Sequence, residues 1–432
     1  MWLVGGTFQP GASPRGLPET SRRSPEHLRK SRSAVTSGLF GRVRLPRFFL
    51  HVKHGLFRPP GRPLTVLRPV ALACIMLGLW LWPSRADAYA WMLKHGRTKC
   101  ASCHTDPSGG ETLTHMGRVA SQRLLSGTQS PYSDRAKFLF GLDEPDALNL
   151  GGSLRVLSLY SAATDEAPSK VRAFPMQADV YATAQVARLR AGLSLGYAQV
   201  RPASPHVRAT QVTSNADGGN LISRWHWLGY ELSDTLLLRG GRMNLPFGVR
   251  VPEHTLWTRD HTKTDRESDQ EHGLALASWS GSWRYEFMFI LGNFQVSPDR
   301  FRRRGYSVYL EHLVTPEFAV GLSSLVTQSE ADRYSGAAER TLRQAHGATL
   351  RYGINPELAC LGEFNALKTS RRAYGFAGFA MCDYEPWAGK HLQLTIEASD
   401  EGRLQGTQSG VGNGDLGLGT WASLVWFPVA HF

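Results

Sequence analysis

From about Asn149 onward, polar and apolar residues alternate with a period of two, and this pattern constrains the fold more than any other feature. Between residues 177 and 186, polar or aromatic side chains fill the odd positions and Ala or Val fills the even ones. Residues 189–197 and 391–399 repeat the alternation. A period of two indicates β-strands with two chemically different faces.

The length and the ends of these runs favour strands that cross a membrane. The predicted strands have about 10–13 residues; crossing a bilayer takes about 9–11 tilted residues, whereas soluble strands usually have about 5–6. The chain also ends in Phe432 on an amphipathic run, which resembles the insertion signal of bacterial outer-membrane proteins. Trp and Tyr recur near the predicted strand ends, as in interfacial girdles: Trp225, Trp227, Trp283, Tyr306, Trp421 and Trp426.

The sequence therefore predicts an all-β fold over residues 148–432. We expect a closed transmembrane antiparallel β-barrel of about fourteen strands, with polar residues inside and apolar residues toward lipid. A soluble β-sandwich with its faces reversed would show the same alternation and remains the alternative. No helical crossover pattern appears, which argues against an α/β enzyme fold.

The net charge of +13 lies almost entirely at the N-terminus. Residues 1–88 carry 14 Lys and Arg against 3 Asp and Glu, so residues 89–432 have a net charge of only +2. Since the basic excess falls in a part that we expect to be removed, nucleic acid is not an expected partner.

Residues 61–88 are predicted to be a signal peptide. Basic residues precede the apolar run Val70–Trp82, which is followed by Pro83 and by the small residues Ala86 and Ala88. A retained amphipathic or core helix is the alternative. Residues 1–60 lack hydrophobic periodicity, and we interpret them as disordered or as the product of a misassigned start codon.

Residues 100–104 read Cys-Ala-Ser-Cys-His. Two thiols three positions apart can add to the two vinyl groups of a haem, and the adjacent imidazole then binds the iron. The motif begins 12 residues after the predicted cleavage site. A redox Cys pair and half of a zinc site are the alternatives, but a thioredoxin-like context and a second Cys/His pair are both missing. We expect one covalent haem c on Cys100, Cys103 and His104.

The sixth ligand of the iron stays open. His115 and Met116 lie downstream of the motif, and Met92 and His95 lie upstream. A thioether ligand would raise the reduction potential relative to a second imidazole, and an empty position would bind small ligands. We prefer Met116.

The motif lies in a stretch that resembles a family of bacterial exported proteins in which a short single-haem segment precedes an outer-membrane β-barrel. The resemblance covers residues 89–147 and is carried by Ala90-Trp91-Met92, Cys-x-x-Cys-His, Asp106–Gly110, Leu113-Thr114 and Gly117-Arg118. It implies a short, mostly irregular or helical haem-c segment ahead of a barrel that is similar in outline to porin-like partners of electron-transfer chains. The family has an aromatic residue near position 116, where this chain has Met116.

Two further features concern the predicted barrel. Cys360 and Cys382 lie on adjacent strand-like runs, at matching distances from the turn near Ser370, so they form either a disulfide or two buried thiols. The long connection Leu245–Gly273 either folds into the lumen, with Arg259, Asp260, Asp265 and Asp269 along a pore, or forms a solvated external loop. We interpret its histidines, His254, His261 and His272, as surface residues because their spacing matches no metal site.

Three functions follow as hypotheses. The first is electron transfer at or across the outer membrane of a Gram-negative bacterium, with periplasmic or outer-membrane redox proteins as partners and the barrel in the lipid bilayer. The second is a porin-like channel whose haem segment acts as a plug or sensor. The third, a haem enzyme, needs distal catalytic groups that the sequence does not reveal, so we expect an electron carrier rather than a catalyst.

Overall fold

The computed structural model describes residues 90–107, 109–124, 147–161, 169–199, 207–215, 218–251, 253, 255–403 and 416–427. The predicted signal peptide, the stretch before it and Phe432 lie outside these residues. Within the described part of the chain, no helix is long and apolar enough to cross a membrane.

Residues 90–124 form a compact stretch with three short helices, which we call the N-terminal segment. The helices are η1 (Ala90–His95), α2 (Cys100–Cys103) and α3 (His115–Leu124). No strand of the sheet forms here; an isolated bridge between His104 and Leu113 closes the loop that follows α2.

The chain after the N-terminal segment is almost entirely β-structure. Among the described residues, fourteen strands follow one another as antiparallel neighbours in a single sheet, and a fifteenth, β4, pairs only with β3. The strands are β1 (Leu148–Ser161), β2 (Lys170–Val186), β3 (Leu189–Gln199), β4 (Gly219–Ile222), β5 (His226–Ser233), β6 (Leu236–Met243), β7 (Glu271–Ser278), β8 (Trp283–Gly292), β9 (Arg304–Thr315), β10 (Phe318–Ser329), β11 (Thr341–Asn355), β12 (Leu358–Thr369), β13 (Gly375–Trp387), β14 (Lys390–Asp400) and β15 (Gly417–Trp426).

The predicted antiparallel sheet of about fourteen strands is therefore confirmed, and closure between the edge strands β1 and β15 stays a prediction. The connections alternate in length. Apart from the short β4, the strands are joined by turns of two to four residues after β2, β5, β7, β9, β11 and β13, and by connections of five or more residues elsewhere. In an antiparallel meander, the short turns all lie at one end of the sheet and the long loops at the other. The loops contain η2 (Val207–Thr210), α5 (Trp257–Thr262) and η3 (Asp299–Phe301).

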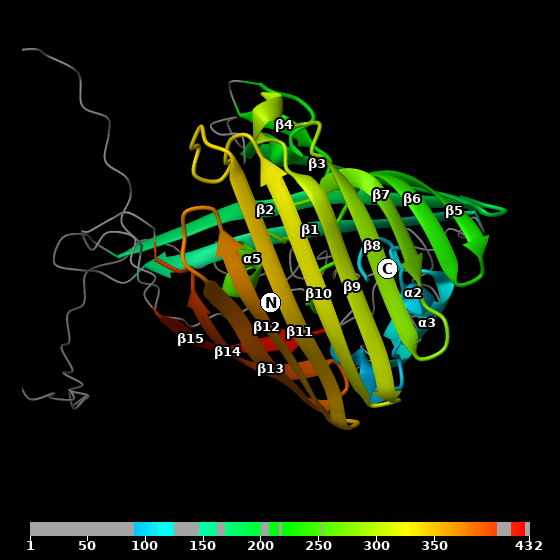
Figure 1. Cartoon of the computed structure of the whole chain (residues 1–432). Helices are drawn as coiled ribbons and strands as arrows, with labels where there is room; N and C mark the ends of the chain where they lie inside the picture. The colour runs from blue at the N-terminus through cyan, green and yellow to red at the C-terminus, as the bar shows by residue number, and fades with distance from the viewer. Residues whose placement is uncertain are drawn as a thin grey trace, which may run out of the picture. The chain divides into compact units, whose positions relative to one another are not determined.

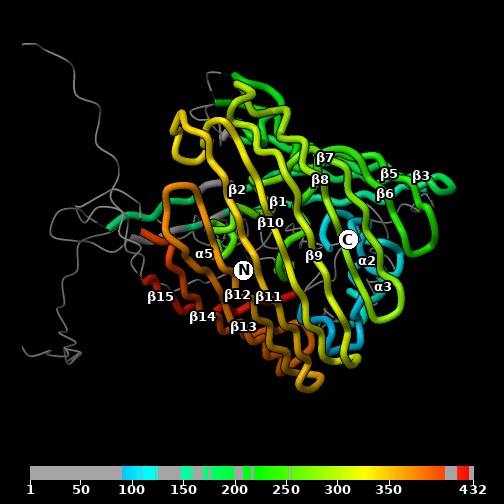
Figure 2. Tube along the Cα trace, viewed as in Figure 1, coloured from blue at the N-terminus to red at the C-terminus, as the bar shows by residue number. Residues whose placement is uncertain are grey.

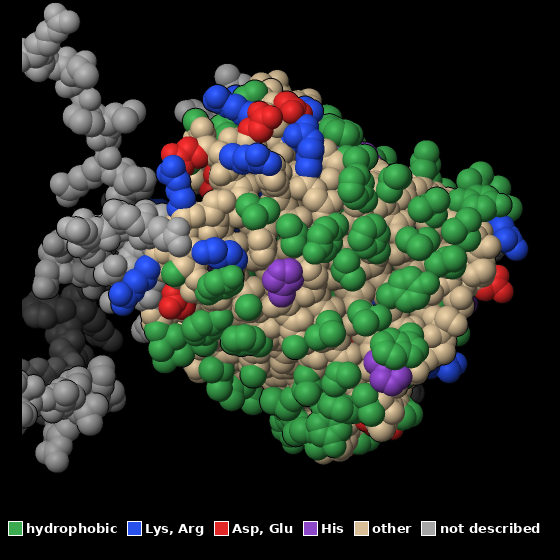
Figure 3. Space-filling model, in the orientation of Figure 1, with side chains coloured by type: hydrophobic (Ala, Val, Ile, Leu, Met, Phe, Trp, Pro, Cys, Tyr) green, Lys and Arg blue, Asp and Glu red, His purple; other side chains and the backbone are tan. Residues whose placement is uncertain are grey.

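The two faces of the sheet have opposite chemistry. On the outward face, Leu228 and Leu418 are each 70% exposed, while the inward-facing Arg239 and Glu286 are each 1% exposed. Figure 3 shows hydrophobic side chains spread over one outward region and most of its charged side chains gathered toward the long-loop end. A soluble β-sandwich buries apolar residues and exposes charged ones, so the sandwich alternative is wrong.

The sheet curves around an interior that the chain itself occupies. The N-terminal segment contacts inward-facing residues of β2, β5, β6, β8, β11 and β13. In Figures 1 and 2, β1 to β3 cross behind β9 to β12. One sheet can contact the segment from so many strands only if it bends around it.

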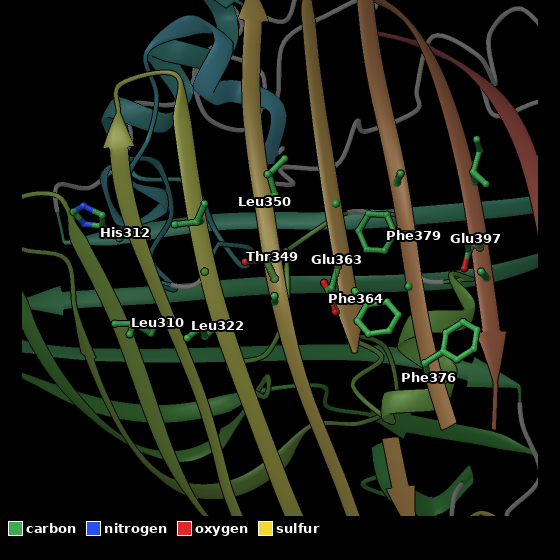
Figure 4. Close-up of a pocket in the computed structure, with 18 of the residues that line it drawn as sticks. Leu310, His312, Leu322, Thr349, Leu350, Glu363, Phe364, Phe376, Phe379 and Glu397 are labelled. Carbon is green, nitrogen blue, oxygen red and sulfur yellow. The ribbon is translucent and has the colours of Figure 1, made fainter. Parts of the chain in front are cut away.

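A shallow hollow of about 900 Å³ lies over β9 to β14 (Figure 4). Small residues such as Gly362, Gly378 and Ala380 line it together with larger apolar side chains, among them Leu322 and Phe364. These residues belong to the outward face, whereas Glu363 and Glu397, which also line the hollow, are buried.

The aromatic prediction is only partly right. Trp283 and Trp426 are about half exposed on the outward face, as a girdle requires. Trp225 and Trp227 are instead buried inside, and Trp421 packs at 5.8 Å from Trp257 of a loop. Trp227 lies near the end of β5 as predicted, but the register turns it inward. Trp225 directly precedes β5, and Trp421 lies in the middle of β15 rather than at its end.

Candidate functional site

The Cys-x-x-Cys-His motif forms one helical turn followed by extended backbone. Cys100 and Cys103 lie on α2 as half-buried free thiols, and His104 is buried. His104 Nδ1 lies 3.0 Å from the carbonyl oxygen of Gly110. Because a carbonyl only accepts, Nδ1 carries the hydrogen and Nε2 of the neutral ring holds the lone pair that an iron would need. This hydrogen bond is of the kind that orients a metal-binding histidine, and two thiols with an adjacent imidazole are the donors that a covalent haem requires.

Close packing between helices α2 and α3 fixes the motif. The backbone nitrogen of Thr114 donates to the carbonyl oxygen of Cys103 at 3.0 Å. A Cβ at Gly117 would lie 2.1 Å from the same oxygen, so only glycine fits there. This contact explains why glycine is needed at position 117, which is one of the residues that carry the family resemblance.

Buried ion pairs tie the N-terminal segment to the sheet. Asp106 binds Arg239 of β6 at 3.0 Å, and both side chains are 1% exposed. Lys94 lies 2.9 Å from Asp383 and 3.0 Å from Glu385, both on β13. Buried charges are tolerated when they are paired in this way.

Neutral contacts complete the anchoring. Thr112 donates to Thr183 of β2 at 2.8 Å, and the ring of Trp91 lies 4.5 Å from that of His391 on β14. Trp91 and Leu93 are part of a buried apolar cluster with strand residues. The segment is thus held from several sides of the curved sheet.

Cys100 faces a half-buried arginine that the sequence reasoning missed. Arg284 Nη1 lies 3.3 Å from Cys100 Sγ, and the guanidinium carbon lies 4.9 Å from the ring centre of Tyr309. Tyr309 donates to Glu311 at 2.7 Å, and Glu311 accepts from Arg351 at 2.6 and 2.8 Å. The alternation predicts that these side chains point inward, but it does not predict which residue of a distant segment they meet.

The four candidates for the sixth iron ligand have different surroundings. His95 Nε2 lies 3.1 Å from Glu385, and Met92 packs against the apolar cluster around Trp91. His115 and Met116 are exposed on the first turn of α3, next to α2. The choice of Met116 stays a prediction.

The long connection between β6 and β7 folds into the interior, and we call residues 244–270 the inserted loop. It ends earlier than predicted, because Glu271–Ser278 form β7. Val249, Val251 and Leu256 are at most 3% exposed and pack with strand residues in the same apolar cluster as Trp91. The alternative of a solvated external loop is therefore wrong.

Ion pairs and hydrogen bonds hold the inserted loop against the inner wall. Arg259 donates to both oxygens of Glu363 on β12 at 2.9 and 2.7 Å, and the backbone nitrogen of Trp257 donates to Glu397 on β14 at 2.6 Å. Asp269 lies 3.0 Å from Arg333. Two of the four predicted pore residues, Arg259 and Asp269, are thus engaged in internal pairs. The other two differ, since Asp260 is exposed and Asp265 accepts from Ser268 within the loop.

Two of the three histidines expected at the surface have partners. His272 Nε2 lies 3.2 Å from His226 Nε2, and His261 Nδ1 lies 3.0 Å from Glu401. The ligand atoms of Asp260, His261 and Glu401 lie within 4.8 Å of one another. Lys263 and Arg372 already bind the two carboxylates, which disfavours a cation there. His254 lies outside the described residues.

Cys360 and Cys382 stand directly opposite each other in the register of β12 and β13. Their Cα atoms are 4.1 Å apart, and their sulfur atoms form a disulfide. Both residues lie on the outward face, away from the N-terminal segment.

No family model and no curated protein matches this chain. The solved structures that it is similar to include an OmpT loop-deletion mutant of Vibrio cholerae (12% identity, 65% of this chain and 99% of that chain, TM-score 0.41). They also include the anion-selective porin of Comamonas acidovorans (8% identity, 65% and 99%, TM-score 0.36) and Salmonella typhi OmpF in complex with daunomycin (12% identity, 65% and 97%, TM-score 0.43).

Proposed function

We propose that this chain is an outer-membrane β-barrel protein that transfers electrons through one covalent haem c held inside the barrel by the N-terminal segment. One observation carries the proposal: a Cys-x-x-Cys-His motif with the hydrogen bonding of an iron ligand lies within a sheet that is apolar outside and charged inside.

The location follows from the exposed surface. Leu, Val, Ile and Phe side chains cover the outward face of nearly every strand. In water such a face would drive aggregation, whereas lipid solvates it. Lipid also requires that the sheet close, because no backbone group can stay unpaired in the hydrocarbon. We therefore expect β1 and β15 to be joined in the folded protein.

The orientation follows from the connections. Outer-membrane barrels have short periplasmic turns and longer external loops. Lys94 donates to the carbonyl of Glu357 in the turn between β11 and β12, which places η1 at the short-turn end. We therefore expect the motif to face periplasmic redox proteins, while the inserted loop fills the external half of the lumen.

Cys100 and Cys103 would hold the haem through thioether bonds, and His104 would be the proximal ligand. The haem supplies a one-electron couple when it is bound. The protein's own residues orient His104 through Gly110, keep the motif against α3 and exclude water with buried pairs such as Asp106–Arg239.

A porin-like channel, with the segment as plug or sensor, is the second candidate. The inserted loop favours it, since a polar loop inside a barrel restricts a pore. Against it, inward-facing charged residues including Arg239, Arg242 and Glu271 are at most 1% exposed, which leaves little room for a solute.

Proteoliposomes separate the two candidates. The intact protein is expected to carry electrons between an external reductant and an enclosed acceptor, and a Cys100→Ala/Cys103→Ala variant is expected to lose this exchange. Solute flux in the wild-type protein without faster electron exchange than in the double variant would contradict the electron-transfer proposal and support the channel.

A further inference from the structure

The loop after the motif places one acidic side chain at a conformational cost. Gly109, Gly110 and Glu111 have φ angles of 89°, 114° and 61°. Glycine adopts such angles freely, but a glutamate in the left-handed region is uncommon and strained. Glu111 is also only 6% exposed. This backbone conformation therefore holds a buried carboxylate inside the curved sheet.

The carboxylate of Glu111 has a defined environment. Trp227 Nε1 of β5 lies 3.0 and 3.1 Å from its two oxygens. The charged neighbours are Asp106 from the segment, Arg239 from β6 and Arg266 from the inserted loop. Asp106 and Glu286 of β8 are both bound to Arg239. Glu111 thus accepts its hydrogen bonds from the neutral N–H of Trp227, with Arg239 and Arg266 as nearby cations.

Glu111 is also coupled to the haem motif through one residue. Gly110 accepts the hydrogen bond from His104 Nδ1, and Glu111 follows it directly. A charge added near His104 changes the electrostatic potential at Glu111 with little screening, because the surroundings are buried. Asp106 and Glu286 each form a direct ion pair with Arg239.

We propose that Glu111 binds one proton for each electron that the haem site gains and releases it when the site is oxidised. This inference rests on the proposed function. The electron comes from the protein redox partner and stays at the haem site, while the proton comes from water and forms an O–H bond on the Glu111 carboxylate. Oxidation reverses both transfers.

The direction in which the surroundings shift the pKa of Glu111 supports the proposed proton uptake. Burial, together with the Asp106 carboxylate, raises the pKa of Glu111 well above its ordinary value. The group therefore takes up a proton more readily than an exposed glutamate, and added negative charge strengthens that tendency.

The test is the reduction potential of the full-length haem-loaded protein in detergent as a function of pH. The reduction potential of the wild-type protein is expected to fall by up to about 59 mV per pH unit, because one proton is bound for each electron. Glu111→Gln is expected to flatten this dependence. The matched control Glu357→Gln removes an exposed turn carboxylate and is expected to leave it unchanged.

A second variant keeps the carboxylate. Trp227→Phe removes the N–H donor that favours the ionised form, so the pH-dependent range is expected to move to higher pH with its slope intact. A flat wild-type profile, a Glu111→Gln profile that keeps the wild-type slope, or an unmoved range in Trp227→Phe overturns the inference. Failure of the proposed function is a different result, because the purified wild-type chain would then contain no covalent haem.

Discussion

At the residue scale, the N-terminal segment is held by charges that water cannot reach. The side chains of Lys94 and Asp383 are both fully buried, and Glu385 is the second carboxylate of the same cluster. Compared with a variant in which both partners are apolar, a buried ion pair adds little to stability. Removal of one partner is more costly, because the remaining charges lose a buried counter-ion; here Asp383 and Glu385 would keep His391 and His95 as neighbours.

Lys94→Met is therefore expected to destabilise the protein by about 3–5 kcal/mol. The change leaves Asp383 and Glu385 without the ammonium group between them. Urea unfolding in detergent measures the loss, and Lys390→Met, at an exposed position, serves as the control with a change of less than about 1 kcal/mol. A midpoint for Lys94→Met equal to that of the control would show that the pair does not hold the segment.

Gly117→Ala is expected to lower covalent haem loading several-fold. A Cβ there would meet the backbone oxygen of Cys103, so α3 would have to move away from the motif. The haem-to-protein ratio of the purified chain measures this. Gly362→Ala is the matched control, because its Cβ would have its nearest neighbour at an ordinary 3.8 Å. Equal loading in the two variants would contradict the account of the α2–α3 contact.

The motif residues could be read from the sequence, and their partners could not. Cys100, Cys103 and His104 are adjacent, and their spacing alone suggests the chemistry. Arg284 is 184 positions from Cys100, and their contact depends on the register of β8 and on the path of the segment. Glu111 was missed because its significance lies in a backbone angle and in burial, which composition does not reveal.

At the element scale, strands were predictable and the inserted loop was not. A strand with two different faces has a signature of period two. The inserted loop mixes polar and apolar residues without a period, and its buried side is defined by residues such as Glu363 and Glu397 on remote strands. Trp225 and Trp227 were assigned to the wrong face for the same reason, because the register was not yet fixed.

The inserted loop is expected to be less stable at neutral than at acidic pH. Burial, with Asp269 and Glu267 nearby, raises the pKa of Asp265 to about 7 from 3.8. The folded state therefore keeps a proton that the unfolded state loses, so stability is highest below about pH 4 and falls as the pH rises toward 7. One proton limits the slope to about 1.4 kcal/mol per pH unit, and the partial exposure of Asp265 reduces the total effect.

Asp265→Asn is expected to remove this decline, since the amide cannot ionise. Urea midpoints between pH 4 and pH 8 measure the effect. Asp260→Asn, on an exposed aspartate of the same loop, is the control and should follow the wild-type curve. A decline that persists unchanged in Asp265→Asn would mean that another group causes it.

At the scale of the whole molecule, the apolar exterior and the charged interior indicate that lipid surrounds the sheet. The exposed apolar face extends from β2 to β15, and the charged residues face an interior filled by the N-terminal segment and the inserted loop. We expect extraction to require detergent. The unheated protein should migrate differently from the boiled protein in gel electrophoresis, because a closed barrel resists unfolding. Identical mobility together with release by salt alone would contradict a transmembrane barrel.

The most direct test of the account is a haem-stained gel of fractionated membranes. The account predicts a haem-positive band of this chain that resists denaturation, occurs in the outer-membrane fraction and disappears in Cys100→Ala/Cys103→Ala while the protein itself remains. A full-length chain in that fraction without covalent haem, or haem-stained protein only in the soluble fraction, would contradict it.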